Sequence, residues 1–386
     1  MSEWQKVNLG DCCEITSSKR IFFSEYVESG IPFYRSKEII EKGKGEEISH
    51  PLYISKEKYD EIKGKYGVPQ KGDLLLTAVG SLGIPFVVKD DSPFYFKDGN
   101  LVWLKHFQDI DPIFLYYWIK SENGYNALYN IAIGSAQKAL TIAAIKGYEI
   151  PLPPLQTQHR IANILSRYDS LIENYQKQIK LLEEAAQRLY KEWFVDLRFP
   201  GHENTKIVDG VPEGWTPSQL GQLAEFKRGK TITKKDVIDG DIPVVAGGLE
   251  PAYYCNKSNT AERVITISGS GANAGFTRMY FEKVWASDCS FVDASVTPFL
   301  HFVYCYLKAN KTTIDNMQKG AAQPHVYAKD INSLSICIPI ESVLKSFEEK
   351  VSNYFDTTAS LQSQLRLLTE ARDRLLPKLT NGEMEI

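Results

Sequence analysis

The residues that could do chemistry in this chain form three short motifs, each of which departs from the catalytic pattern that it partly matches. The glycines of residues 269–275 have the spacing G-x-G-x-x-x-G, whereas a dinucleotide-binding loop has G-x-G-x-x-G within a βαβ unit. Asp111-Pro112-Ile113-Phe114 lacks the second proline of the Asp-Pro-Pro-Tyr motif, and Glu61-Ile62-Lys63 lacks the upstream Pro-Asp of a nuclease half-motif. We interpret these motifs as a turn, a helix start and a solvated face, and predict no catalytic residue.

Metal and membrane sites are not indicated either. The six histidines are dispersed, and the six cysteines have no Cys-x-x-Cys spacing, which favours free thiols in a reducing cytoplasm. No apolar run reaches the ~18–20 residues of a membrane span, and the start of the chain lacks the features of a signal peptide. A cytoplasmic protein without a metal site or a membrane anchor is therefore expected.

Cationic loops offer the other possible chemistry, which is the binding of nucleic acid. Residues 225–235 contain one acid, Glu225, and five cations, Lys227, Arg228, Lys230, Lys234 and Lys235. Comparable positions nearer the N-terminus hold Lys19-Arg20 and Tyr34-Arg35-Ser36-Lys37. Such side chains can neutralise phosphates, and arginine can donate two hydrogen bonds to guanine. For each residue, the alternative is a solvated loop tip.

Two further pairs of loops, 77–83 with 268–275 and 137–138 with 323–325, supply hydroxyl, amide and imidazole groups that suit base edges. The formal net charge of −3 argues against unaided binding through a broad basic surface, but it is compatible with local patches. The predicted DNA-contacting residues are Arg20, Arg35, Ser36, Lys37, Thr77, Ser81, Gln137, Lys138, Arg228, Lys230, Ser268, Ser270, Asn273, Gln323 and His325.

Two long helices are predicted to position these loops. From Ile161 to Trp193 the apolar residues alternate steps of four and three, which is the heptad pattern of a coiled coil about 50 Å long. The apolar stripe needs a partner, and a second helix with the same stripe follows 186 residues later, with Pro377 expected to end it. The predicted seam consists of Ile161, Leu165, Tyr168, Ile172, Ile179, Leu182, Val351, Tyr354, Leu361, Leu365, Leu368 and Leu375.

The repeat extends beyond the helices. The same shift of 186 carries Gly134-Ser135-Ala136-Gln137 onto Gly320-Ala321-Ala322-Gln323, and a shift of 211 carries Leu9-Gly10 onto Leu220-Gly221. The shift falls to 189 between 77–81 and 266–270, so the first copy has about 22 extra residues near 42–70. Two similar scaffolds with divergent loops suggest similar tasks on different targets.

The predicted fold is α+β, with two similar mixed α/β domains separated by two long antiparallel coiled-coil helices and related by a pseudo-two-fold axis. Strands are expected at 73–77 and 85–88, and a short helix at 112–119. The predicted parts are a first globular domain at 1–154, a central helix at 155–199, a second globular domain at 200–338 and a C-terminal helix at 339–386.

The junction Ile150-Pro151-Leu152-Pro153-Pro154-Leu155-Gln156, with the helix start up to Leu165, resembles a junction in specificity subunits of type I restriction-modification enzymes. In that family it joins a target recognition domain to the central conserved helix. Gly134-Ser135-Ala136-Gln137 before the junction and Val211-Pro212-Glu213-Gly214-Trp215 after it are also typical. The resemblance covers nearly the whole chain, although Ile340-Glu341-Ser342 departs from the usual Pro-Leu-x at the second junction.

The resemblance implies a non-catalytic subunit that binds no cofactor itself. Each recognition domain would read one half of a bipartite double-stranded DNA target, and the coiled coil would set the spacer and dock two methyltransferase subunits. S-adenosylmethionine, ATP and Mg would belong to those subunits and to a restriction subunit with motor and nuclease activity. Two other classes remain open, namely a DNA methyltransferase or nuclease with an unrecognised active site, and a coiled-coil adaptor without DNA binding.

Overall fold

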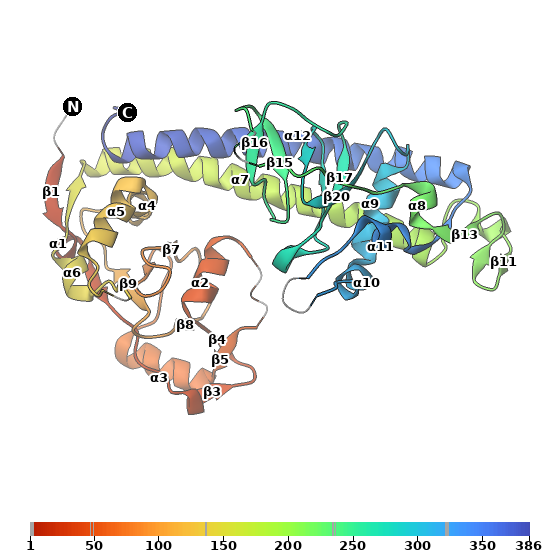
Figure 1. Cartoon of the computed structure of the whole chain (residues 1–386). Coiled ribbons are helices and arrows are strands. Elements are labelled where there is room, and N and C mark those ends of the chain that lie inside the picture. Colours follow the sequence, from red (N-terminus) through yellow and green to blue (C-terminus); the bar gives the residue numbers. More distant parts are fainter. Residues whose placement is uncertain are drawn as a thin grey trace. The chain divides into compact units, whose positions relative to one another are not determined.

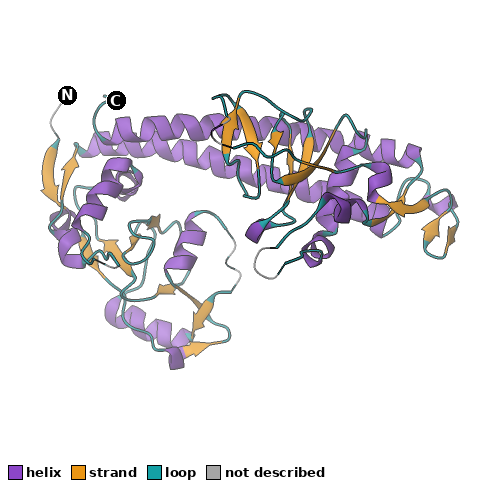
Figure 2. Cartoon of the chain, viewed as in Figure 1, coloured by secondary structure: helices purple, strands orange, loops and turns teal. Residues whose placement is uncertain are grey.

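The computed structural model of the chain describes residues 4–46, 48, 50–135, 137–233, 235, 237–320 and 324–386, so Lys234 and Gln323 lie outside the described residues. The chain forms two compact units. Unit 1 comprises Met1–Tyr175 with Gln364–Ile386, and unit 2 comprises Gln176–Ser363. Each unit therefore combines one globular part with a segment of both long helices, and the predicted α+β fold with two similar domains is confirmed (Figures 1 and 2).

The globular part of unit 1 contains two four-stranded sheets and a two-stranded sheet. The sheet orders are β2-β9-β6-β7, β3-β5-β4-β8 and β1-β10. The strands are β1 Gln5–Asn8, β2 Glu14–Thr16, β3 Tyr26–Val27, β4 Ile31–Tyr34, β5 Leu52–Ile54, β6 Leu74–Thr77, β7 Pro85–Val87, β8 Tyr95–Phe96, β9 Leu101–Lys105 and β10 Glu149–Leu152. The short helices are α1 Leu9–Cys12, α2 Ser36–Gly43, α3 Lys56–Tyr66, α4 Pro112–Lys120, α5 Glu122–Ile131 and α6 Ile142–Lys146.

The globular part of unit 2 repeats this plan with the sheets β14-β20-β17-β18, β16-β15-β19 and β13-β21, and adds the hairpin β11-β12. The strands are β11 Ile207–Val208, β12 Val211–Pro212, β13 Thr216–Gln219, β14 Lys227–Arg228, β15 Ile242–Val245, β16 Tyr253–Cys255, β17 Val264–Ser268, β18 Thr277–Tyr280, β19 Trp285–Ala286, β20 Cys289–Asp293 and β21 Ser335–Ile338. The short helices are α8 Leu220–Leu223, α9 Leu300–Ala309, α10 Lys311–Asn316 and α11 Ala328–Asn332.

The repeated Leu-Gly pair has a steric reason. A Cβ at Gly10 would lie 3.0 Å from the carbonyl oxygen of Lys146, and one at Gly221 would lie 3.0 Å from the Cβ of Asn332. Both glycines therefore allow the first short helix of each unit to approach the segment before the last strand. The extra residues of the first copy form α2 and α3, which follow β4 and β5 in the chain.

The two long helices are α7, Leu155–Tyr190, and α12, Glu341–Thr380. In unit 1, Arg372 of α12 donates to Asp169 of α7 over 2.8 Å. In unit 2, the ring of Phe347 on α12 lies 5.9 Å from that of Trp193, in the π-helical turn Lys191–Val195 that follows α7. Early residues of one helix thus contact late residues of the other in each unit, as an antiparallel pair requires.

The predicted seam residues are all buried or half-buried. Ile161, Leu165, Ile172, Val351 and Leu361 are buried, and the other seven are half-buried. The predicted end at Pro377 is wrong, because α12 continues to Thr380. Proline removes only its own N–H donor, and the last turn is held by Leu379, which is buried in the core of unit 1, and by a 3.0 Å bond from the Asn381 N–H to the Pro377 carbonyl.

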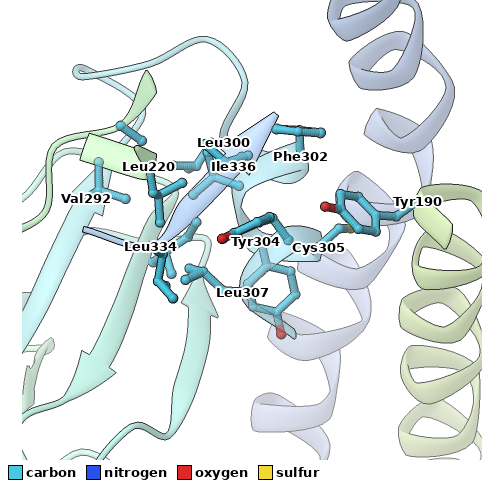
Figure 3. Packing of buried hydrophobic residues seen from close by; sticks show 14 of the residues in the cluster. Tyr190, Leu220, Val292, Leu300, Phe302, Tyr304, Cys305, Leu307, Leu334 and Ile336 are labelled. Atoms are coloured by element: carbon cyan, nitrogen blue, oxygen red, sulfur yellow. The ribbon is translucent and has the colours of Figure 1, made fainter. Parts of the chain in front are cut away.

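Helix α9 joins the sheet of unit 2 to its long helices. Val292 and Leu334 lie on the sheet side of α9, whereas Tyr190 projects from α7 toward Cys305 (Figure 3). The rings of Tyr190 and Phe302 are 5.6 Å apart.

All six cysteines are free, and burial raises the pKa of the Cys289 thiol to about 12, so little of this thiol is in the nucleophilic thiolate form.

Within the described residues, no group of three or more His, Cys, Asp or Glu side chains is placed to hold a metal ion. The described helices include none that is long and apolar enough to span a membrane.

Candidate nucleic-acid interface

In each copy, residues that flank the repeated glycine form β-bridges with each other and with the loop after an inner strand of the sheet, β6 in unit 1 and β17 in unit 2. In unit 1, Ile133 and Val79 both form bridges with Ala139, and in unit 2, Lys319 and Ser270 both form bridges with His325. Gly134 and Gly320, which directly follow Ile133 and Lys319, have φ values of 105° and 101°, which other residues rarely adopt. We call the described residues of 77–83 and 133–139 the paired loops of unit 1, and those of 268–275 and 319–325 the paired loops of unit 2.

The paired loops of unit 2 lie beside the predicted cation Arg228. This exposed residue of β14 lines a small hollow of about 30 Å³ together with Asp288, Ser290, His325 and Tyr327. The imidazole of His325 stacks on the Tyr327 ring at 5.9 Å and 9°. Three segments that are distant in the sequence thus bring a guanidinium, an imidazole, a phenol and a carboxylate together. In the described part of the chain, no ion pair involves Arg228, so its donors remain available to a ligand.

Two predicted contacts in these loops need correction, because their side chains hold the loops together. Thr77 is fully buried, donates to the Ser81 carbonyl and accepts from the Ile84 N–H at 2.8 Å. Ser268 is also buried and donates to the Gly247 carbonyl at 3.1 Å. Neither hydroxyl is accessible to DNA in this conformation.

Two other predicted residues of unit 2 are partly accessible but already bonded. The Ser270 hydroxyl donates to the Asp288 carboxylate, and the Asn273 amide donates to the Gly247 carbonyl at 3.4 Å. Lys230 is exposed, and its backbone accepts a 2.7 Å bond from the Trp285 indole, which leaves the ammonium group outside the fold. Lys230 and Arg228 are therefore the accessible cations of this edge among the predicted set.

Arg35 acts in the fold of unit 1 rather than as a free cation. Its guanidinium and its backbone N–H both bind Glu38, which is buried. Burial alone would raise the pKa of Glu38, but the hydrogen bonds from Arg35 outweigh it, and the pKa is lowered. Ser36 donates to the Asn100 carbonyl at 3.3 Å, so it too supports the start of α2.

The remaining cations near Arg35 are exposed ion-pair partners. Arg20 pairs with Asp98 at 2.9 Å, and Lys37 pairs with Glu41 at 3.5 Å. Exposed pairs of this kind contribute little to stability and can exchange a carboxylate for a phosphate. Both residues therefore remain predictions as phosphate contacts.

The accessible face of the unit 1 loops contains aromatic rings that sequence reasoning missed. Tyr125 and Tyr129 are stacked at 6.1 Å along α5 and are 44% and 43% exposed. The predicted residue Lys138 places its ammonium 3.6 Å from the centroid of the Tyr129 ring. Ser81 and Gln137, both predicted, are exposed in the paired loops. The signal for the tyrosines was their four-residue spacing on a helix, which is also typical of core residues.

This face of unit 1 can bind by stacking and by charge. Exposed rings can pack on bases or sugars, and an ammonium held over a ring keeps its charge available to a phosphate. In unit 2, the imidazole of His325 in the paired loops and the guanidinium of Arg228 on the nearby strand β14 are available instead. The two units thus expose different chemical groups around similar paired loops.

Comparison with known proteins gives one family. Residues 1–184 and 212–368 match the family described as type I restriction modification DNA specificity domain. The chain is similar to the type I restriction enzyme MjaIX specificity subunit of Methanocaldococcus jannaschii, with 28% identity over 347 residues, covering 82% of this chain and 78% of that protein. It is also similar to a putative type I restriction enzyme specificity subunit of Haemophilus influenzae, with 34% identity over 187 residues, covering 48% of this chain and 45% of that protein.

A solved structure has the same fold. The crystal structure of a type I restriction-modification system S subunit from M. genitalium covers 97% of this chain and 96% of its own, with a TM-score of 0.64 and 20% sequence identity. At this identity the likeness concerns the fold alone.

Proposed function

The chain belongs to the type I restriction-modification DNA specificity family, and from this premise we propose that each of its units reads one half of a bipartite double-stranded DNA target. The observation that carries the proposal is the duplicated pair of loops, built by the same bridges around Ala139 and His325. A repeated framework with different exposed side chains suits two half-sites of different sequence.

We assign the contacts by the chemistry that each unit exposes. In unit 2, Arg228 can donate two hydrogen bonds to a guanine edge, and Lys230 can bind a phosphate. In unit 1, Lys138 can bind a phosphate while Tyr125 and Tyr129 pack against the sugar or the base. The imidazole of His325, held by its stack on Tyr327, can hydrogen-bond to a base edge.

The chain is proposed to be a non-catalytic subunit, as the names of its relatives suggest. The proposed partners are two methyltransferase subunits, which would use S-adenosylmethionine, and restriction subunits, which would use ATP and Mg. The long helices α7 and α12 would dock the methyltransferase subunits and set the spacer between the half-sites. The complex would act in the cytoplasm, where bacterial and archaeal DNA is located.

The test is a map of methylated adenines in genomes with and without this chain. We expect one bipartite motif to lose methylation when the chain is deleted and to regain it when the chain is restored. Purified chain that methylates or cleaves DNA alone would favour an enzyme with an unrecognised site. A reconstituted complex that retains no DNA sequence specifically would favour a coiled-coil adaptor.

A further inference from the structure

Unit 1 contains a large hollow where β1, the start of α7 and the residues after α12 meet. Its volume is about 1000 Å³. Apolar walls come from Trp4, Val7, Leu152 and Leu155, and Gly382, Met384, Glu385 and Ile386 form part of its border. The hollow lies away from the paired loops, so the proposed DNA contacts do not use it.

Unit 2 shows what fills the corresponding place. Strand β13 pairs with β21 as β1 pairs with β10, so Trp215 corresponds to Trp4 and Ile338 to Leu152. In unit 2, the linker after α7 covers this region: the Phe199 ring lies 4.9 Å from the Trp215 ring, and the Phe194 ring lies 5.9 Å from it. Trp215 is only 7% exposed as a result.

The segment at the end of α12 lacks these two rings. A shift of 186 places Thr380 at the position of Phe194 and Glu385 at the position of Phe199. Trp4 is half-buried, with the backbone of Gly382 close to one edge of its indole. The unit 1 hollow thus shares a tryptophan, Trp4, and an apolar strand residue, Leu152, with the unit 2 site, but it lacks the two aromatic side chains that cover the tryptophan there.

The border of the hollow is acidic. Asp11, Asp109 and Glu385 line it with exposed carboxylates. The linker that fills the unit 2 site carries Arg198 next to Phe199. A segment with the same order of residues would place two rings on the apolar walls and a guanidinium near these carboxylates, where charge attraction adds to apolar burial.

We propose that the unit 1 hollow binds a segment of a second protein that carries two aromatic side chains about five residues apart, with a basic residue between them. The spacing is that of Phe194 and Phe199, which fill the matching site in unit 2. The proposal does not depend on DNA recognition, because neither the hollow nor its occupant includes a residue of the paired loops.

A labelled peptide with the sequence of residues 191–202 of this chain tests the proposal against the whole protein by fluorescence polarisation. The covalently attached linker of unit 2 has an effective concentration in the millimolar range, so the free peptide does not displace it. We expect saturable binding, and at least about tenfold weaker binding for a peptide in which both phenylalanines are alanine, because buried aromatic anchors dominate such contacts. Equal binding of the two peptides, or no binding of the first, would overturn the proposal.

Two variants of α7 localise the site. Leu155 lines the hollow and is 43% exposed, and Leu171, also on α7 in unit 1, lies outside it and is 42% exposed. We expect Leu155→Arg to weaken peptide binding about tenfold and Leu171→Arg to leave it unchanged, with circular dichroism showing that both variants are folded. Equal binding by both variants would contradict the proposal. Concentration-dependent self-association that only Leu155→Arg abolishes would assign the hollow to a second copy of the chain instead.

Discussion

Unit 1 and unit 2 pair corresponding strands in the same register, but their corresponding helices expose different side chains. In unit 1, Gln5 lies opposite Leu152, and in unit 2, Thr216 lies opposite Ile338. On α5, Tyr125 and Tyr129 stack, whereas the corresponding positions on α10 hold the ion pair Lys311–Asp315. The burial of one face of each sheet fixes the register of the paired strands in both units, because a shift of a strand by one residue would turn its core side chains to the solvent. The helix surface is free to change its chemistry.

The units also attach to their long helices through different residues. In unit 1, Tyr117 donates to Asp169 of α7 at 2.8 Å. In unit 2, the ring nitrogen Nδ1 of His301 lies 2.7 Å from Glu348 of α12, which also accepts from the Phe302 N–H. These carboxylates are not at corresponding positions of the repeat. The same packing of globule on helix is thus achieved with different polar contacts, which allows one unit to change without the other.

The largest expected effect follows from exchanging one unit's globular part. Replacing residues 1–150 with the matching domain of a relative should change one half of the methylated motif and leave the other half unchanged. The physical reason is that the paired loops of each unit are built from its own residues. Motif mapping on DNA methylated in vivo measures the result. A change in both halves would show that the units do not read independently.

A second experiment tests the helices that both units share. Seven residues inserted into α7 after Tyr175 and into α12 after Ser363 keep the seam in register, because one heptad restores the same face. The helices become about 10 Å longer, or roughly three base pairs at ~3.4 Å each. We expect the two specified halves to persist and the spacer to grow by about three base pairs.

Binding by this extended variant should be weaker, since three base pairs also rotate one half-site by nearly a third of a turn, given ~10–10.5 base pairs per turn. The segments 151–154 and 199–201, which join the globular parts to the long helices, would have to change conformation to accommodate that rotation. An insertion of the same residues into α12 alone, which shifts the pairing of the helices, is the matched control and should abolish methylation. If the double-insertion variant is active and keeps the original spacer, the helices do not set the spacer length and serve only to dock the methyltransferase subunits.

Two arginines that the sequence places in similar loops should behave differently. Arg228→Ala should weaken binding by about 1–3 kcal/mol and relax one target position if Arg228 contacts a base. If it contacts a phosphate, all sequences should weaken alike, and the slope of log affinity against log salt should fall by roughly one. Binding titrations at several salt concentrations distinguish these results from unchanged binding, which would mean that Arg228 faces solvent and does not contact DNA.

Arg35→Ala is the contrasting variant. Its guanidinium is bound to the buried Glu38, so removal should lower the stability of unit 1 by about 1–3 kcal/mol and leave the motif unchanged. Thermal unfolding and motif mapping measure the two effects. If the methylated motif becomes less specific without a loss of stability, Arg35 contacts DNA.

The sequence predicts the framework well because its signals are periodic. The heptads and the repeated landmarks located the long helices, and the α4 segment begins at Pro112 as expected, with Asp111 accepting bonds from the first turn. The exposed residues were harder to predict. Thr77 and Ser81 are both hydroxyl residues of one loop, yet only Ser81 is exposed, because the loop closes on the Thr77 hydroxyl. Glu38, three residues after Arg35, was the available signal for a local ion pair.

The smallest expected effect concerns a position where the repeat pairs a neutral residue with a charged one. Glu183 of α7, in unit 2, corresponds to Thr369 of α12, in unit 1. The Glu183 carboxylate faces the Tyr304 hydroxyl at 3.5 Å, and burial raises its pKa, although Lys308 and Arg278 oppose the shift. A carboxyl with a raised pKa favours the folded state most when it is protonated, below its pKa in the unfolded chain. That contribution is lost as the pH rises through the folded pKa, so near neutrality the charge destabilises unit 2.

Glu183→Gln keeps a polar side chain at this position and removes the charge. We expect the variant to be more stable than the unchanged protein near pH 7, because it removes a charge whose burial opposes folding. The difference should shrink as the pH falls toward the pKa of an unfolded glutamate, because the native carboxyl is then protonated as well. Thermal unfolding between pH 4 and 8, in ~1 unit steps, measures this dependence. The neighbouring Glu184, whose side chain is 41% exposed, is the matched control, and Glu184→Gln should change stability by less than about 0.5 kcal/mol at every pH. A Glu183→Gln variant that is less stable at pH 7 would mean that the charges of Lys308 and Arg278 outweigh the cost of burial, and that unit 2 needs the carboxylate where unit 1 has a threonine.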